Sequence, residues 1–148
     1  MRMTVLEYNK LKLRLNKNKK NLQGKKVKKR ATFVLPWPVS VNKMYATDKN
    51  GKRVLSKKAV KYYKECKPYF AVQNVPAFYN KTKMLIEFFP NRDGWDASNF
   101  RKAPEDAIVK AGIIPDDQVK YLQPLAPVIH KRVKRDKQPY IKITMEEI

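Results

Sequence analysis

Apolar and polar residues alternate in several short segments of the chain, and this period of two predicts β-strands. The alternation is clearest in residues 140–145, where Ile141, Ile143 and Met145 are separated by polar side chains. One face of the expected sheet is therefore covered and the other is polar. Further apolar or β-branched segments predict strands at residues 32–35, 84–89 and 128–133.

Two other segments carry the signals of helices. Ser56 can cap a helix in which apolar residues recur at helical spacing from position 59 to position 66, and Pro68 is expected to end or kink it. A second helix is expected to end just before Gly112, because glycine is favoured immediately after a helical C-terminus. Together the elements predict an α+β domain, a small mixed sheet with two main helices packed on it.

The net charge of the chain indicates what kind of partner it binds. Among 148 residues, 34 Lys and Arg stand against 13 Asp and Glu, which gives a formal net charge of +21. Such a field attracts a polyanion. Nucleic acid is favoured over a membrane because the sequence has no long apolar run and no sustained amphipathic helix. Charge alone would favour a ribosomal-type protein that coats RNA.

Cysteine usage and the first residues add two expectations about the compartment. Cys66 is the single cysteine, so an intrachain disulfide is excluded and a reducing environment is expected. The first residues lack the apolar stretch of a secretory signal, and we therefore expect a cytoplasmic protein.

Residues 1–30 are expected to form a basic accessory arm, partly disordered or helical, ahead of a folded domain at residues 31–148. The arm holds 12 Lys and Arg and one acid, so that 12 minus 1 gives +11 of the total charge. The basic run at its end is either a phosphate-binding segment or a solvated linker, and both interpretations stay open. The run consists of Lys25, Lys26, Lys28, Lys29 and Arg30.

The acidic residues are concentrated where an RNA-coating protein would not need them. Six of the 13 fall within one segment: Asp93, Asp96, Glu105, Asp106, Asp116 and Asp117. A carboxylate cluster repels phosphates unless a cation lies between them, and metal-assisted phosphodiester chemistry supplies that cation. With one cysteine and one histidine, His130, the chain cannot assemble the usual structural zinc site, whereas oxygen ligands suit Mg²⁺, with Mn²⁺ as an alternative.

Each of these carboxylates also has an ordinary structural interpretation. Asp96 or Ser98 can be a helix N-cap, and residues 115–117 can form a turn. A shared metal site requires that Asp96, before the expected helix, approaches Asp116 and Asp117, which follow it. His130 is interpreted as a packing or surface residue.

Three groups of residues occur along the chain in an order that is typical of one family. Residues 35–42, followed by Tyr45, form a proline-rich segment that leads from a strand to Asn42. Residues 96–102 read Asp-Ala-Ser-Asn-Phe-Arg-Lys, and residues 105–119 contain a helix followed by Asp-Asp-Gln-Val. Over residues 32 to about 145, these segments resemble the RusA family of Holliday junction resolvases, whose acidic motif is Asp-x-Asp-Asn followed by a lysine.

The resemblance implies a homodimeric, Mg²⁺-dependent enzyme, of a kind common in phages and prophages, that nicks two opposing strands of a four-way DNA junction. By the same resemblance the catalytic residues are Asp96, Asp117 and Lys102, and the neighbouring Asp116 is added to the metal ligands. Residues assigned to DNA binding, besides the basic run of the arm, are Asn42, Asn99, Arg101 and Lys102.

Two positions depart from the family pattern. Ser98 stands where the family has its second catalytic aspartate, and a neutral hydroxyl is a weaker ligand for a hard cation. Asp93, Asp116 or a water must then replace it, or activity is impaired. Pro104 fits the second helix only if that helix starts near Lys102 or has an irregular first turn.

The resulting prediction is a structure-specific endonuclease that resolves Holliday junctions by paired symmetric nicks in DNA recombination and repair. Two alternatives stay open. One is a non-catalytic basic protein that binds nucleic acid, and the other is a nuclease that acts on other branched DNA, such as a flap or a replication fork.

Overall fold

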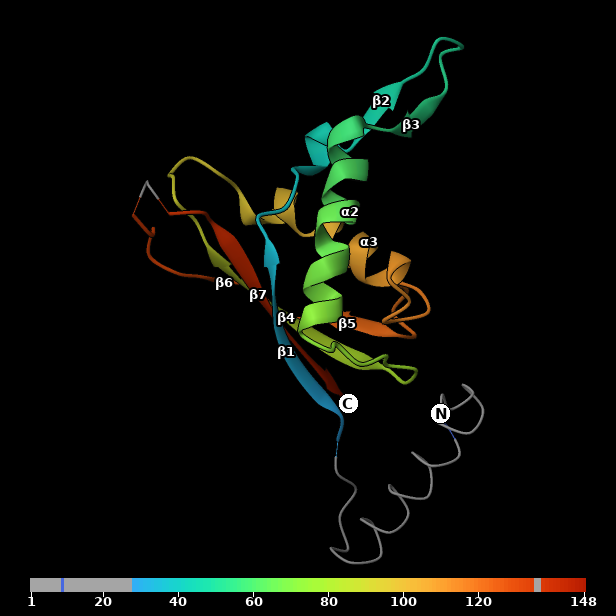
Figure 1. The fold of residues 1–148 in the computed structure, drawn as a ribbon, viewed down its shortest axis with the longest axis vertical. Coiled ribbons are helices and arrows are strands. Elements are labelled where there is room, and N and C mark those ends of the chain that lie inside the picture. Colours follow the sequence, from blue (N-terminus) through green and yellow to red (C-terminus); the bar gives the residue numbers. More distant parts are fainter. Residues whose placement is uncertain (1–8, 10–27, 135–136) are drawn as a thin grey trace, which may run out of the picture.

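A computed structural model of the chain describes residue 9, residues 28–134 and residues 137–148. Its main feature is a mixed sheet in the order β1-β7-β4-β5, in which β6 also pairs with β4. Figure 1 shows this sheet with helices α2 and α3 beside it. The strands are β1 (Arg30–Pro36), β4 (Thr82–Phe89), β5 (Leu122–Pro124), β6 (Val128–Ile129) and β7 (Tyr140–Glu147).

The sheet has the alternation that the sequence predicts. The central strand β7 is antiparallel to both β1 and β4, while β5 and β6 run parallel to β4. In β7, Ile141, Ile143 and Met145 are buried, and the residues between them are half-buried. One face of the sheet therefore packs into the core, and the α+β class with two main helices is confirmed.

The first helix, α2 (Lys57–Val72), begins where the sequence predicts. The Ser56 hydroxyl accepts a hydrogen bond from the Ala59 amide at 3.2 Å, which satisfies one of the free donors of the first turn. Pro68 does not end the helix, contrary to that part of the prediction. Pro68 lies on the exposed side, and the buried Cys66 and Phe70 on either side of it hold the last turns against the core.

The second helix, α3 (Lys102–Lys110), starts at Lys102 and so places Pro104 in its first turn, where a missing amide donor costs little. Gly112 follows the C-cap residue with a φ of 74°, a conformation that favours glycine and ends the helix as predicted. The 3-10 turns η1 (Val41–Lys43) and η2 (Ala97–Phe100) complete the helical elements of the described residues.

Two elements differ from the sequence prediction. The strand expected at residues 128–133 is limited to β6 (Val128–Ile129), because beyond it, among the described residues, only the amides of His130 and Val133 bind the chain of β4 and Pro90, and no regular ladder continues. The Asn- and Gly-rich turn region forms a hairpin of β2 (Tyr45–Thr47) and β3 (Arg53–Leu55) that the pattern did not predict. No helix in the described ranges is long and apolar enough to cross a membrane.

The open edge of β1 is capped at Val34 by a side chain. Gln73, the C-cap residue of α2, accepts a hydrogen bond from the Val34 amide and donates one to the Val34 carbonyl, both at 2.8 Å. The side-chain amide thus takes the place of a neighbouring strand. An uncovered edge offers a template for pairing with another chain, so this contact both fastens α2 to the sheet and protects the edge.

Gln73→Ala should therefore lower the free energy of unfolding by about 1–3 kcal/mol, because two backbone groups of Val34 lose their partner. Chemical denaturation measures this change, and light scattering should report increased self-association. Gln138→Ala, at an exposed position, is the control and should behave as the wild type. Equal stabilities of the two variants would show that the contact contributes nothing.

Candidate active site

The segment that carries Asp96 is held by aromatic residues on both sides. Trp95 packs edge-on against Trp37 at a ring distance of 5.0 Å and lies 5.2 Å from Phe88. Phe100 lies 5.5 Å from Trp37 and is buried. Trp37 belongs to the Pro-Trp-Pro segment at the end of β1, and Phe88 belongs to the end of β4. Their contacts with Trp95 and Phe100 therefore fix the position of η2 against the core.

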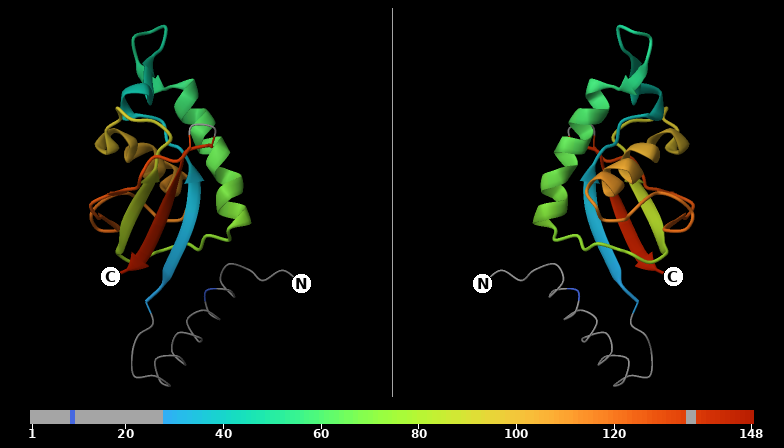
Figure 2. Two further views of the ribbon diagram at one scale, coloured as in Figure 1. Left: turned by 90° about the vertical axis from the view of Figure 1, so that its left-hand side faces the viewer. Right: turned by 90° about the vertical axis from the view of Figure 1, so that its right-hand side faces the viewer.

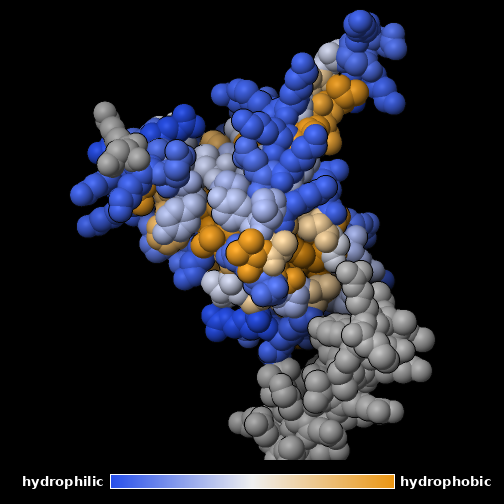
Figure 3. All heavy atoms as spheres, in the orientation of Figure 1, coloured by the Kyte–Doolittle hydropathy of each residue, from blue (hydrophilic) through white to orange (hydrophobic). Residues whose placement is uncertain are grey.

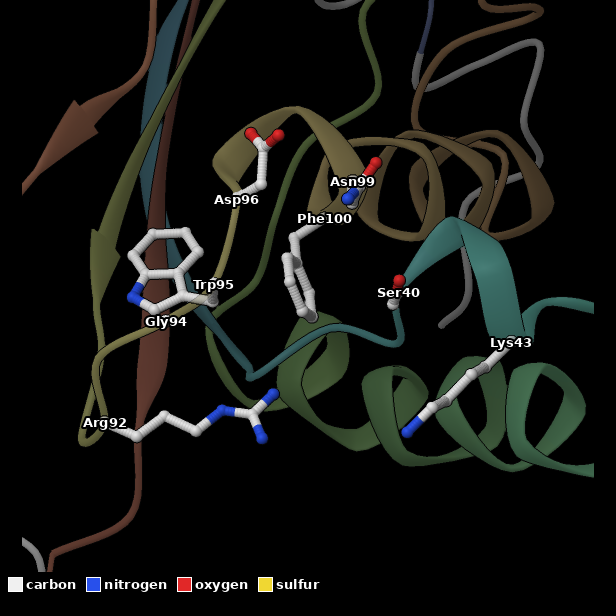
Figure 4. Close-up of a pocket in the computed structure, with 8 residues that line it drawn as sticks. All are labelled: Ser40, Lys43, Arg92, Gly94, Trp95, Asp96, Asn99 and Phe100. Carbon is white, nitrogen blue, oxygen red and sulfur yellow. The ribbon is translucent and has the colours of Figure 1, made fainter.

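A pocket lies beside this anchored segment, and Figure 4 shows the residues that line it. Lys43 and Arg92 extend toward it from opposite sides, and the Asp96 carboxylate turns away from the Trp95 ring. The full lining consists of Ser40, Lys43, Arg92, Gly94, Trp95, Asp96, Asn99 and Phe100. The recess is therefore lined by two cationic residues and by Asp96, whose carboxylate points away from the two cations in Figure 4.

Asp96 is the N-cap residue of η2. The Ser98 hydroxyl donates to Asp96 Oδ1 at 2.8 Å, and the Ser98 amide donates to the same oxygen at 3.0 Å. These hydrogen bonds lower the pKa of Asp96 below its ordinary value, so the exposed side chain is ionised at neutral pH. Asp96 thus caps the short turn η2, whereas the expected helix α3 begins after Arg101 without a side-chain cap, and Ser98 acts on Asp96 as a hydrogen-bond donor.

Lys102 links the two ends of the α3 segment. Its Nζ lies 3.0 Å from Asp117 Oδ2, beyond the helix, and 3.0 Å from Asp106 Oδ1, one turn along it. The Tyr63 hydroxyl of α2 donates to the other oxygen of Asp106 at 3.3 Å. Of the three residues predicted to be catalytic, the structure brings Lys102 and Asp117 into direct contact.

This network stabilises the charged forms of both partners. The hydrogen bond from Lys102 lowers the pKa of Asp117. Partial burial of Lys102 opposes its charge, but the hydrogen bonds to Asp106 and Asp117 outweigh that effect and raise its pKa. Burial, followed by the Asp106 carboxylate, raises the pKa of Tyr63, which stays a neutral donor. The ammonium group is therefore held with its charge between two carboxylates.

The other predicted ligands have separate partners. Asp116 Oδ1 accepts a hydrogen bond from the Asp117 amide at 2.7 Å, and Asp93 pairs with Arg132 at 3.1 Å. Among the described residues, no three acidic, histidine or cysteine side chains are grouped as a metal site, so the structure does not bring Asp96, Asp116 and Asp117 together as one three-carboxylate cluster. A carboxylate such as Asp96, exposed and bonded through one oxygen, still fits Mg²⁺, which binds through one or two carboxylates and completes its shell with water and phosphate.

The predicted DNA-binding residues outside the basic run differ in their surroundings. Asn42, on η1, is exposed, and Asn99 lines the pocket. Arg101 is engaged by Glu105 at 2.8 Å; burial raises the pKa of that carboxyl, although the guanidinium opposes the shift.

Of the basic run, Lys29 donates to the Ala77 carbonyl and lies 5.0 Å from the Phe78 ring centre, and Arg30 belongs to β1 and pairs with Glu146 at 3.9 Å. Lys28 is exposed, while Lys25, Lys26 and nearly all of the predicted arm lie outside the described residues. The folded part thus reaches back to Lys29.

Sequence reasoning missed three side chains of this region and the structural role of a fourth, Asp106. Lys43 and Arg92 flank the pocket from η1 and from the turn after β4, and Asp106 and Tyr63 hold Lys102. The i, i+4 spacing of Lys102 and Asp106 on one helix was a usable signal. Nothing in the sequence indicates that Tyr63, 43 positions from Asp106, meets it.

The comparisons with known proteins give no family for the chain. No protein-family model matches it, and no curated protein is significantly similar to it. The RusA resemblance consequently stays a prediction that depends on the motifs.

Asp117→Asn should remove the ion pair with Lys102 and lower stability at pH 7 by less than about 1 kcal/mol, because the pair is partly exposed. The folded chain depresses the pKa of Asp117 below 3.8, so its contribution is present above that pH and is lost as the pH falls through the folded value. The difference between the denaturation curves of the two proteins should therefore be present at pH 7 and shrink as the pH falls below 3.8. Asp93→Asn, at a more exposed pair, is the control.

Proposed function

We propose that this protein is a divalent-metal-dependent, structure-specific DNA endonuclease that resolves four-way junctions by paired nicks in recombination and repair. The observation that carries the proposal is the 3.0 Å contact of Lys102 with Asp117 across α3, where Lys102 follows by two residues Phe100 in the lining of the pocket that contains Asp96. Carboxylates next to cationic side chains in a chain of net charge +21 suit phosphodiester chemistry better than passive coating of a nucleic acid.

Each residue of the site has a role in this proposal. Asp96 and Asp117, with Asp116 adjacent, would hold the metal. When bound, Mg²⁺ polarises a phosphate and lowers the pKa of a coordinated water. Lys43 and Arg92 would orient the phosphate by charge and hydrogen bonding. Lys102 would stabilise the charge that develops on the phosphate oxygens, and Asp106 keeps its ammonium group in place.

Asp96→Asn and Asp117→Asn should each lower the nicking rate by roughly a hundredfold or more, because an amide is a poor ligand for a hard cation. Binding to a labelled four-way junction without Mg²⁺ should persist in both. Asp93→Asn removes a carboxylate of the same segment outside the pocket and should cut normally. Nicking that survives in the first two variants, or disappears equally in all three, would contradict the assignment.

A homodimer is part of the proposal, because two symmetric nicks require two active sites related by a two-fold axis. Sedimentation of the protein with junction DNA should give two chains per junction, and the two nicks should appear at positions related by symmetry. A single chain per junction with one nick would contradict the paired mechanism, although it would still support nuclease activity.

A protein that binds branched DNA without cutting it is the second candidate. The two hydrogen bonds from Ser98 to Asp96 favour it, since they give Asp96 a structural role and come from the position where the resemblance requires a second acid. A Mg²⁺ titration separates the candidates, because binding without products supports the second. Flaps and forks, tested beside the junction, decide which branched substrate is cut.

A further inference from the structure

The β2–β3 hairpin projects from the body of the protein. In Figures 1 and 2 it extends beyond the N-terminal end of α2, away from the sheet. Three residue pairs, from Tyr45–Leu55 to Thr47–Arg53, form its antiparallel ladder. Residues 46–47 and 49–54 are exposed. The hairpin therefore contributes little to the core.

The hairpin is basic and its tip is hydrophilic, as Figure 3 shows. Lys49, Lys52 and Arg53 are exposed, and the single acid, Asp48, is used within the turn. Asp48 Oδ1 accepts hydrogen bonds from the amides of Asn50 at 2.9 Å and Lys52 at 2.8 Å. None of the three cationic side chains has a carboxylate within ion-pair distance among the described residues.

The base of the hairpin is fixed to the domain. Met44 is fully buried, and its carbonyl accepts a hydrogen bond from the Ser56 amide at 2.8 Å, on the other side of the hairpin. The Arg53 guanidinium lies over the Tyr45 ring at 4.0 Å, which orders the cation and covers one face of the ring. The positive charges are therefore presented in a defined direction.

The hairpin also starts at the candidate active site. Lys43 lines the pocket with Asp96, and β2 begins two residues later. A polyanion whose phosphate occupies this pocket passes the root of the hairpin, so the cations along the hairpin continue the positive surface away from the site.

We propose that the β2–β3 hairpin binds the sugar-phosphate backbone of one duplex arm of the DNA, next to the proposed cleavage site. This proposal rests on the function proposed above and adds the element that positions the substrate. Lysine and arginine bind phosphates without reading sequence, and a two-stranded ribbon fits a groove of duplex DNA. Residues 46–54 include no aromatic side chain, and Tyr45 at the base is half-buried with Arg53 over its ring, so the exposed part of the hairpin has no platform for stacking unpaired bases.

The test compares two variants of equal charge. Lys49→Ala/Lys52→Ala/Arg53→Ala removes three hairpin cations, and Lys64→Ala/Lys67→Ala/Lys81→Ala removes three exposed lysines elsewhere, so each lowers the net charge from +21 by three. Without Mg²⁺, the slope of log binding constant against log salt on a four-way junction should flatten by about 2–3 in the hairpin variant, at roughly 0.9 per lost phosphate contact. The control should keep the wild-type slope. Equal slopes in the two variants would overturn the proposal.

A directed cleavage experiment tests the contact itself. Asn50→Cys puts a thiol at the hairpin tip for a tethered iron chelate, while Cys66 is buried, which raises its pKa to about 12 and keeps it unreactive. Hydroxyl radicals should cut a few adjacent nucleotides of one duplex arm. Absence of cuts, or cuts confined to unpaired DNA, would overturn the proposal. Such cuts in a protein that never nicks in Mg²⁺ would support the hairpin contact and refute the nuclease.

Discussion

The packing of Trp95 and Phe100 against Trp37 and Phe88 is the constraint on which the candidate site depends. Trp95 precedes and Phe100 ends the short segment that contains η2 and its N-cap Asp96, and Asp96 and Asn99 of this segment line the pocket. Since Phe88 and Phe100 are buried in the core and the two tryptophans pack against it, the backbone that carries the carboxylate is anchored to the fold. Polar groups on an anchored turn keep their geometry better than those on a free loop.

Charge explains the second half of the site. A chain of net charge +21 that collects carboxylates in one segment must compensate them locally, and Lys102 does so for Asp106 and Asp117. Removing Lys102 would leave two neighbouring carboxylates without their cation. A substitution of Lys102 would therefore change stability and activity together. Asp96→Asn and Asp117→Asn separate the structural effect from the chemical effect better. Each removes one negative charge and leaves Lys102 in place, so no carboxylate loses its cation.

The sequence was sufficient where the local pattern decides the structure and insufficient where distant residues meet. Alternation identified β7 and the N-cap Ser56 identified the start of α2, because both signals lie within a few residues. β6 was predicted too long, since strand length depends on its pairing with β4. The motif located Asp96, Lys102 and Asp117, but the pocket residues Lys43 and Arg92 come together only through the fold.

Ser98 gives the site a different charge balance from the motif that it resembles. An aspartate at this position would add a second negative charge beside Asp96, whereas the serine donates to Asp96 Oδ1 and adds none. With Lys43 and Arg92 against one carboxylate, the pocket is net positive before any metal binds. A phosphate can therefore approach it directly, while a divalent cation finds fewer anionic ligands. In the proposed enzyme, substrate and metal would consequently bind together, because the phosphate supplies the oxygen ligands that the serine does not.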